Sequence, residues 1–231
     1  MLKKIFLSIQ KNKDDWLGIS HGKHLEDRLE EELRKNSFIP LRLKLVENKV
    51  SAKQKNQWQA LKKEILQKGN NEIIKNNFST STYNTYFRSP YGSQNFPEFL
   101  VFTNKFIIPI ELKASKRTGS KPMWNSNLPK ANCIYIFASF GKQDITFFRG
   151  IDVIEEKLSN QLWDFFIEVK KTEKKFIQSL TSSERGWKPY IRIAFEQAKS
   201  LLLPEGELDY FRHPHRKKIE NKVLEWLADK D

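Results

Sequence analysis

The stretch from Pro97 to Lys113 reads P-E-F-L-V-F-T-N-K-F-I-I-P-I-E-L-K, which is two apolar runs separated by a short polar segment. Short runs rich in Val, Ile and Phe on either side of a turn are typical of a β-hairpin. We therefore expect two antiparallel strands, Phe99–Phe102 and Phe106–Leu112. If Asn104 and Lys105 are the two turn residues, the register of the hairpin is fixed.

This register places two carboxylates opposite each other. Glu98 then faces Glu111 across the strand pair, with Cβ atoms about 5 Å apart. Side chains alternate between the faces of a strand, so one face carries Glu98, Leu100, Phe102, Ile107, Glu111 and Lys113. The opposite face carries only apolar side chains, which we expect to form the core: Phe99, Val101, Phe106, Ile108, Ile110 and Leu112.

Two acids in this position need a neutralising partner, because like charges directly opposite in a sheet are destabilising. A hard divalent cation bound through carboxylate oxygens meets that need, and Mg²⁺ is the expected ion. Lys113 lies roughly 6.6 Å along the strand from Glu111 on the same face. It is therefore near enough to act on a water or a phosphate at such a metal, a constellation that predicts phosphodiester hydrolysis.

The residues Pro97-Glu98 and Glu111-Leu112-Lys113 resemble the motif of the PD-(D/E)XK nuclease superfamily. That motif has a Pro-acid pair at the start of one strand and acid-x-Lys on the next. The sequence departs from it once, because Glu98 stands where the family usually has Asp. The resemblance implies a restriction endonuclease-like α/β fold, a central mixed β-sheet flanked by helices. It also implies Mg²⁺ as cofactor, Glu98 and Glu111 as catalytic metal ligands, and Lys113 as the third catalytic residue.

A helix is predicted over Gly22–Lys35, where Leu25, Leu29 and Leu33 recur at i+4 steps. In the family that the motif resembles, a helix before the core sheet often adds an acidic residue near the metal. Glu26 and Glu30, one turn apart, match that position, and Glu30 is our choice for a third metal ligand. The alternative is a solvated acidic face.

Two polar segments flank the hairpin and are candidates for DNA contacts. Residues 78–94 are predicted to form a loop that leads to Glu98. The residues placed to contact DNA are Ser93, Gln94 and Asn95. An ordinary surface loop is the alternative. The segment after Lys113 offers phosphate-binding and base-reading side chains, namely Lys116, Arg117, Lys121, Asn125 and Asn127. Trp124 within it is expected to anchor the segment by packing.

The rest of the chain predicts further strands and helices around this hairpin. The expected strands are Phe38–Val46 and a second hairpin of Asn132–Phe140 and Asp144–Arg149; the expected helices are 1–16, Lys53–Lys75, Ile151–Leu180, Pro189–Leu203 and Lys217–Ala228. We expect a single domain over 1–231, with an N-terminal helical part (1–76), a catalytic sheet (77–150) and C-terminal helices (151–231). The long helices are expected to pack on the sheet or on a second subunit.

Charge and composition point to a polyanionic partner. The net charge is +13 with 13% aromatic residues, which suggests a folded basic surface and makes double-stranded DNA the leading partner. No run approaches about 18 apolar residues, so we expect a cytoplasmic protein without membrane contact. The sequence has no P-loop or dinucleotide fingerprint, so no nucleotide cofactor is expected.

The sequence therefore predicts a Mg²⁺-dependent endodeoxyribonuclease, and the resemblance favours a type II restriction endonuclease acting as a homodimer. A repair or junction-resolving nuclease on the same fold is one alternative. A non-catalytic DNA-binding protein, in which Glu98 and Glu111 are merely tolerated on a strand, is another. The cleavage pattern on plasmid DNA distinguishes the three.

Overall fold

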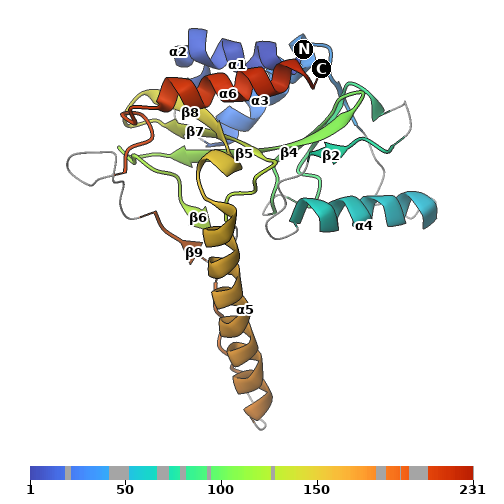
Figure 1. The fold of residues 1–231 in the computed structure, drawn as a ribbon, viewed down its shortest axis with the longest axis vertical. Coiled ribbons are helices and arrows are strands. Elements are labelled where there is room, and N and C mark those ends of the chain that lie inside the picture. Colours follow the sequence, from blue (N-terminus) through green and yellow to red (C-terminus); the bar gives the residue numbers. More distant parts are fainter. Residues whose placement is uncertain are drawn as a thin grey trace.

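The computed structural model describes residues 1–18, 22–41, 52–66, 73–78, 82–92, 95–125, 128–180, 186–192, 194–197 and 208–230. These residues form an α/β fold in which a mixed seven-stranded sheet lies between helices, as predicted (Figure 1). Helices α1, α3 and α6 cover one face, α4 lies on the other side, and α5 projects away from the sheet (Figure 1).

The helices are α1 (Leu2–Lys11), α2 (Lys13–Leu17), α3 (Gly22–Lys35), α4 (Ala52–Leu66), α5 (Glu156–Ser179) and α6 (Arg216–Ala228). The strands are β1 (Ile39–Pro40), β2 (Ile74–Lys75), β3 (Thr85–Arg88), β4 (Phe99–Phe102), β5 (Phe106–Ser115), β6 (Trp124–Asn125), β7 (Ile134–Ser139), β8 (Asp144–Arg149) and β9 (Ala194–Phe195).

The large sheet has the strand order β1-β3-β4-β5-β7-β8, and β2 pairs with β5 outside this path. Strands β3, β4 and β5 form an antiparallel meander, whereas β5 and β7 are parallel. The β4–β5 register pairs Phe102 with Ile107 and Phe99 with Ile110, which is the predicted register. The predicted second hairpin is also confirmed, with β7 antiparallel to β8.

The helical face of the sheet holds the predicted core. Phe99, Val101, Ile108 and Ile110 are fully buried there, together with apolar side chains of α1, α3 and α6. The predicted leucine stripe of α3 (Leu25, Leu29 and Leu33) is fully buried in the same cluster, because its i+4 spacing places all three on the side facing the sheet. The first 17 residues form the two short helices α1 and α2 rather than one.

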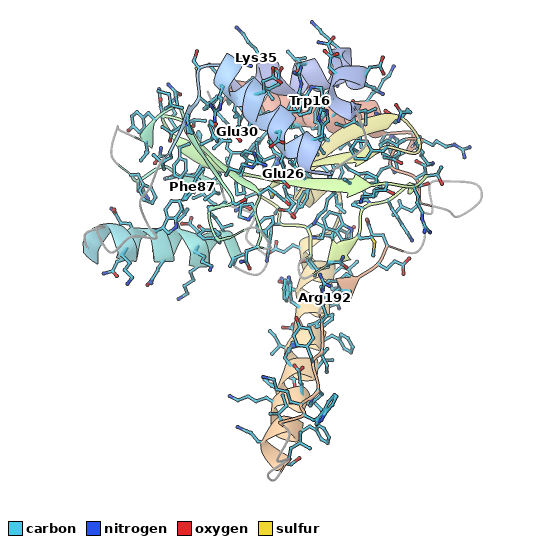
Figure 2. The ribbon with its side chains drawn as sticks, turned by 180° about the vertical axis from the view of Figure 1, so that it is seen from behind. Trp16, Glu26, Glu30, Lys35, Phe87 and Arg192 are labelled. Atoms are coloured by element: carbon cyan, nitrogen blue, oxygen red, sulfur yellow. The ribbon has the colours of Figure 1, made fainter. Side chains whose placement is uncertain are left out.

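The opposite face is also a core, which the sequence did not predict. Leu100, Phe102 and Ile107 pack there with Trp58 from α4 and with aromatic residues of β6, β7 and β8. Phe87 joins this layer, with its ring centroid 5.3 Å from that of Trp58 (Figure 2). The face that carries Glu98, Glu111 and Lys113 is therefore buried along most of its length, and the charged residues lie at one end of it.

Several predicted elements are wrong in detail. The helix predicted over Lys53–Lys75 ends at Leu66, and Ile74–Lys75 instead forms β2, whose backbone groups pair with β5. The loop predicted over residues 78–94 contains β3, which fills the place beside β4. In the helix predicted over Pro189–Leu203, Ala194–Phe195 forms β9 and pairs with β6, while residues 198–203 lie outside the described part.

The remaining predictions hold with adjusted ends. The helix predicted over Ile151–Leu180 is α5, preceded by a 3₁₀ turn at Gly150–Asp152, and the last predicted helix is α6. Of the strand predicted over Phe38–Val46, Ile39–Pro40 forms β1, and residues 42–46 lie outside the described part. None of the described helices combines the length and the apolar composition that crossing a membrane requires.

Candidate active site

The two predicted acids meet where β4 begins beside β5. Glu98 immediately precedes β4, and Glu111 lies within β5, one residue beyond Ile110, which pairs with Phe99. This pairing places Glu98 opposite Glu111, as the hairpin register predicted. The peptide bond between Phe96 and Pro97, just before Glu98, is cis.

Each of these carboxylates is bound by the backbone of the other strand. The backbone N–H of Glu98 donates to Glu111 Oε2 at 3.2 Å, and the backbone N–H of Leu112 donates to Glu98 Oε2 at 3.2 Å. Such reciprocal bonds hold both side chains in fixed positions where β4 begins beside β5. The acid pair is consequently organised before any ligand arrives.

The electrostatics of the pair favour a bound cation. Burial raises the pKa of Glu98 well above its ordinary range, and the hydrogen bond with Glu111 and its charge raise that pKa further. Two carboxylates this close cannot both be charged without compensating positive charge. The Lys113 ammonium, 2.8 Å from Glu111 Oε1, supplies part of it, and a metal ion could supply the rest. Mg²⁺ is commonly held through one or two carboxylates, with other positions left to water and substrate phosphate, so the donor set fits this ion.

Lys113 completes the cluster. Its Nζ donates to Glu111 Oε1 at 2.8 Å, and the side chain is 19% exposed, so the ammonium is sheltered but still reachable. The same Nζ lies 5.8 Å from the ring centroid of Trp124, within the range of a cation–π contact. Glu98, Glu111 and Lys113 are thus brought together as the sequence predicted.

Gln197 is a residue near the site that the sequence did not reveal, and it holds the predicted anchor Trp124. Trp124 is buried, which confirms its predicted packing role, and its Nε1–H donates to Gln197 Oε1 at 3.1 Å. The hydroxyl of Tyr210 donates to the same oxygen at 2.6 Å. Gln197 follows β9, which pairs with β6, so residues far apart in the sequence support the ring under Lys113. No local spacing pattern could have indicated this contact.

Glu30, the predicted third ligand, has both carboxylate oxygens engaged elsewhere. Oε1 accepts from Tyr86 at 2.8 Å and from Arg34 at 2.7 Å, while Oε2 accepts from Arg88 at 2.7 Å. Burial opposes ionisation, but the hydrogen bonds from Arg34, Arg88 and Tyr86 outweigh it and lower the pKa of Glu30 to about 2. Its carboxylate therefore serves an ion-pair cluster on α3, the helix on which Figure 2 labels it.

Arg88 is the centre of that cluster. It donates to Glu26 at 2.8 Å and to Asp27 at 2.7 Å as well as to Glu30, so three acids of α3 hold one guanidinium of β3. The next residue, Ser89, donates its backbone N–H to the carbonyl of Glu98 at 2.7 Å. The cluster thus fixes the end of β3 that supports Glu98. Among the described residues, no group of three or more acidic, histidine or cysteine side chains is arranged to hold a metal.

The predicted DNA-contacting residues have different surroundings. Lys116 and Arg117 are exposed, and the Arg117 carbonyl accepts from Ser139 Oγ at 3.1 Å, so the backbone is fixed while the side chains face solvent. Lys121 is tied to the segment after β9, with Nζ 2.9 Å from Glu196 Oε1 and 2.7 Å from the Gln197 carbonyl. Asn125 is exposed in β6; Ser93, Gln94 and Asn127 lie outside the described residues.

The comparisons with known proteins give no family. No protein-family model matches the chain, and neither a curated protein nor a solved structure matches it.

Proposed function

We propose that this chain is a Mg²⁺-dependent endodeoxyribonuclease that cleaves double-stranded DNA at a defined sequence, as type II restriction enzymes do. One observation carries the proposal. Glu98, Glu111 and Lys113 converge at one end of a buried sheet face, with both carboxylates held by backbone N–H groups and the ammonium 2.8 Å from Glu111. This combination suits a metal ion and a phosphate bound at the same place.

The surrounding charge supports a nucleic-acid substrate. The chain has a net charge of +13, and the exposed Lys116 and Arg117 follow directly after the strand that carries Glu111 and Lys113. Side chains in that position can hold the DNA backbone on either side of the scissile phosphate. The rigid backbone at Arg117 would keep them in register with the site.

In this mechanism Glu98 and Glu111 would hold the metal ion. Mg²⁺, when bound, supplies a Lewis acid that polarises a phosphate oxygen and lowers the pKa of a water. Lys113 presents its ammonium to the phosphate and stabilises the negative charge that develops on the phosphate oxygens. Its ion pair with Glu111 and its contact with Trp124 fix the position of that charge. Because Glu111 is only 7% exposed, these interactions are screened less than they would be in water.

The direct test is digestion of a plasmid of known sequence, with Mg²⁺ and with EDTA, followed by mapping of the DNA ends. We expect discrete fragments in Mg²⁺ only. Glu111→Gln should lose this cleavage, because it removes a proposed metal ligand. Glu225→Gln, at an exposed position of α6, is its matched control and should cut like the parent. Cleavage confined to branched or mismatched DNA would instead assign a repair or junction-resolving activity. DNA binding without cleavage in Mg²⁺ or Mn²⁺ would refute the enzymatic proposal.

A further inference from the structure

Helix α5 extends away from the sheet and is not packed along it (Figure 1). It has 24 residues, and a helix of that length is about 36 Å long. Figure 1 shows it extending away from the sheet, with β6 and β9 near its base. A helix with few contacts to the body of its own domain needs another source of burial for its apolar side chains.

One side of α5 is covered by the chain as it returns towards the sheet. Phe166 and Trp163 pack against Phe195, with ring centroids 4.8 Å and 6.1 Å away. Lys170 Nζ donates to the carbonyl of Ile191 at 2.6 Å, and the Ile191 N–H donates to Glu173 at 2.6 Å. This returning segment, which includes Ile191 and Phe195, therefore covers one face of the helix.

A second stripe of α5 is exposed or half-buried along its length. Its residues recur alternately four and three positions apart, which is the a/d pattern of a coiled-coil seam: Leu158, Leu162, Phe165, Val169, Thr172 and Phe176. Leu158 is 48% exposed, Phe165 62% and Phe176 54%. The stripe runs for about 27 Å along the helix. Large apolar side chains aligned in this way mark a protein interaction site rather than scattered surface residues.

The charges of α5 are separated along its length. Residues 155–168 contain four carboxylates and one lysine, whereas residues 169–180 contain four lysines and one carboxylate. Two such helices side by side in parallel would place acid beside acid and lysine beside lysine. In the antiparallel arrangement, the acidic half of each helix lies beside the basic half of the other, which is the pairing that a two-fold axis produces.

We propose that α5 is a dimerisation arm that pairs antiparallel with α5 of a second copy of this chain through the stripe. Leu158 then faces Phe176 of the partner subunit, and Phe165 faces Val169 of the partner subunit, so that every layer joins one a to one d position. The same register brings Gln161 beside Lys175 of the partner subunit, because each directly precedes a residue of the stripe. The inference concerns assembly and stands apart from the proposed nuclease activity.

DNA is a less suitable occupant of this surface. A helix that follows the phosphate backbone is basic along the contact, whereas the first half of α5 is acidic. The exposed phenylalanines also lie on both halves of the helix, and not only on the basic half. Antiparallel self-association pairs the acidic half of each helix with the basic half of the other, and it covers the phenylalanines on both halves.

The test is sedimentation of the full chain over concentrations of about 1 to 100 µM, a range in which interfaces of modest area commonly dissociate. The parent should change from monomer to dimer. Phe165→Gln combined with Phe176→Gln should raise the dissociation constant by tenfold or more, and a circular dichroism spectrum should show that the fold is retained. Ile167→Gln, an exposed apolar position of α5 outside the stripe, is the control and should leave the dimer unchanged.

A charge exchange tests the orientation. Gln161→Lys should weaken the dimer, because it places two lysines side by side at both contacts of the antiparallel pair. Adding Lys175→Glu to the same chain should restore the dimer, because both contacts then join opposite charges. A parent that stays monomeric throughout the range would refute the proposal. So would stripe variants that lower DNA affinity without any change in mass, which would assign the arm to DNA.

Discussion

The backbone N–H of Glu98 donates a hydrogen bond to the carboxylate of Glu111 at 3.2 Å. The bond is returned from the other strand, since the N–H of Leu112 donates to Glu98 at 3.2 Å. Two acids are thereby fixed side by side. The Lys113 ammonium lies 2.8 Å from Glu111 Oε1, and the raised pKa of Glu98 reflects the remaining cost of holding a second charged carboxylate there. Under the proposed function, a bound cation would offset that cost.

Glu30 should make stability dependent on pH in the acid range. Its folded-state pKa is lowered to about 2 from an ordinary value of 4.5, so its contribution is present above pH 4.5 and is lost as the pH falls towards 2. Glu30→Gln should therefore be less stable than the parent at pH 6, and the difference should shrink by pH 3. Urea unfolding midpoints at the two pH values measure this. A constant difference would show that the ion pairs with Arg34 and Arg88 do not stabilise the fold.

Gln197 should stabilise the floor of the site. Gln197→Ala removes the acceptor for Trp124 Nε1–H and for the Tyr210 hydroxyl, and leaving buried polar groups without partners costs about 1–3 kcal/mol. Cleavage should also slow, because the ring beneath Lys113 loses its support. Urea unfolding and cleavage rates check both effects, with Gln178→Ala at an exposed position of α5 as control. Unchanged stability would mean that Trp124 is held by packing alone.

Lys116 and Arg117 should bind phosphate directly, whereas Lys121 should act mainly within the fold. Replacing Lys116 or Arg117 by Ala should weaken DNA binding at low salt and reduce the slope of log affinity against log salt by about 0.9 for each lost phosphate contact. Stability should not change, because both side chains are exposed. Fluorescence anisotropy titrations at several salt concentrations measure the slope.

Lys121→Ala provides the contrast. This substitution removes contacts with Glu196 and with the Gln197 carbonyl, so we expect it to loosen the junction of β6 with β9 and to affect the salt slope less. Equal slopes for the parent and the Lys116 and Arg117 variants would show that neither side chain contacts phosphate.

The hairpin could be predicted because the residues that determine it are close together in the sequence. Alternation along β4 and β5 and a short polar turn between them determine the register, and the register determines which residue faces Glu98. The leucine spacing of α3 is also a local pattern, and it was sufficient to predict that helix and its buried face. Local patterns could not reveal β3 or β9, because Thr85–Arg88 and Ala194–Phe195 are strands only through their partners β4 and β6.

The surroundings of the site depend on contacts between distant parts of the chain. Glu30 matches the position of a third metal ligand in sequence, but its oxygens are engaged by Arg34, Tyr86 and Arg88, two of which come from β3. Trp124 could be recognised as an anchor, yet its place beneath Lys113 follows from the pairing of β6 with β9. The helix predicted over Ile151–Leu180 was expected to pack on the sheet or on a second subunit, and only the three-dimensional arrangement shows that it extends away from the sheet (Figure 1).

The most direct test of the central claim is the single-turnover cleavage rate of Glu111→Gln at saturating Mg²⁺. The amide keeps the size of the side chain and an oxygen that can accept from Glu98, but it lacks the charge that a metal ligand needs. We predict a rate at least about a hundredfold below the parent, roughly 2.7 kcal/mol of lost transition-state stabilisation. The melting temperature without Mg²⁺ should change little, because the amide loses the ion pair with Lys113 as well as the repulsion with Glu98. A variant that still cleaves within about tenfold of the parent rate would remove Glu111 from the site and contradict the proposed metal site.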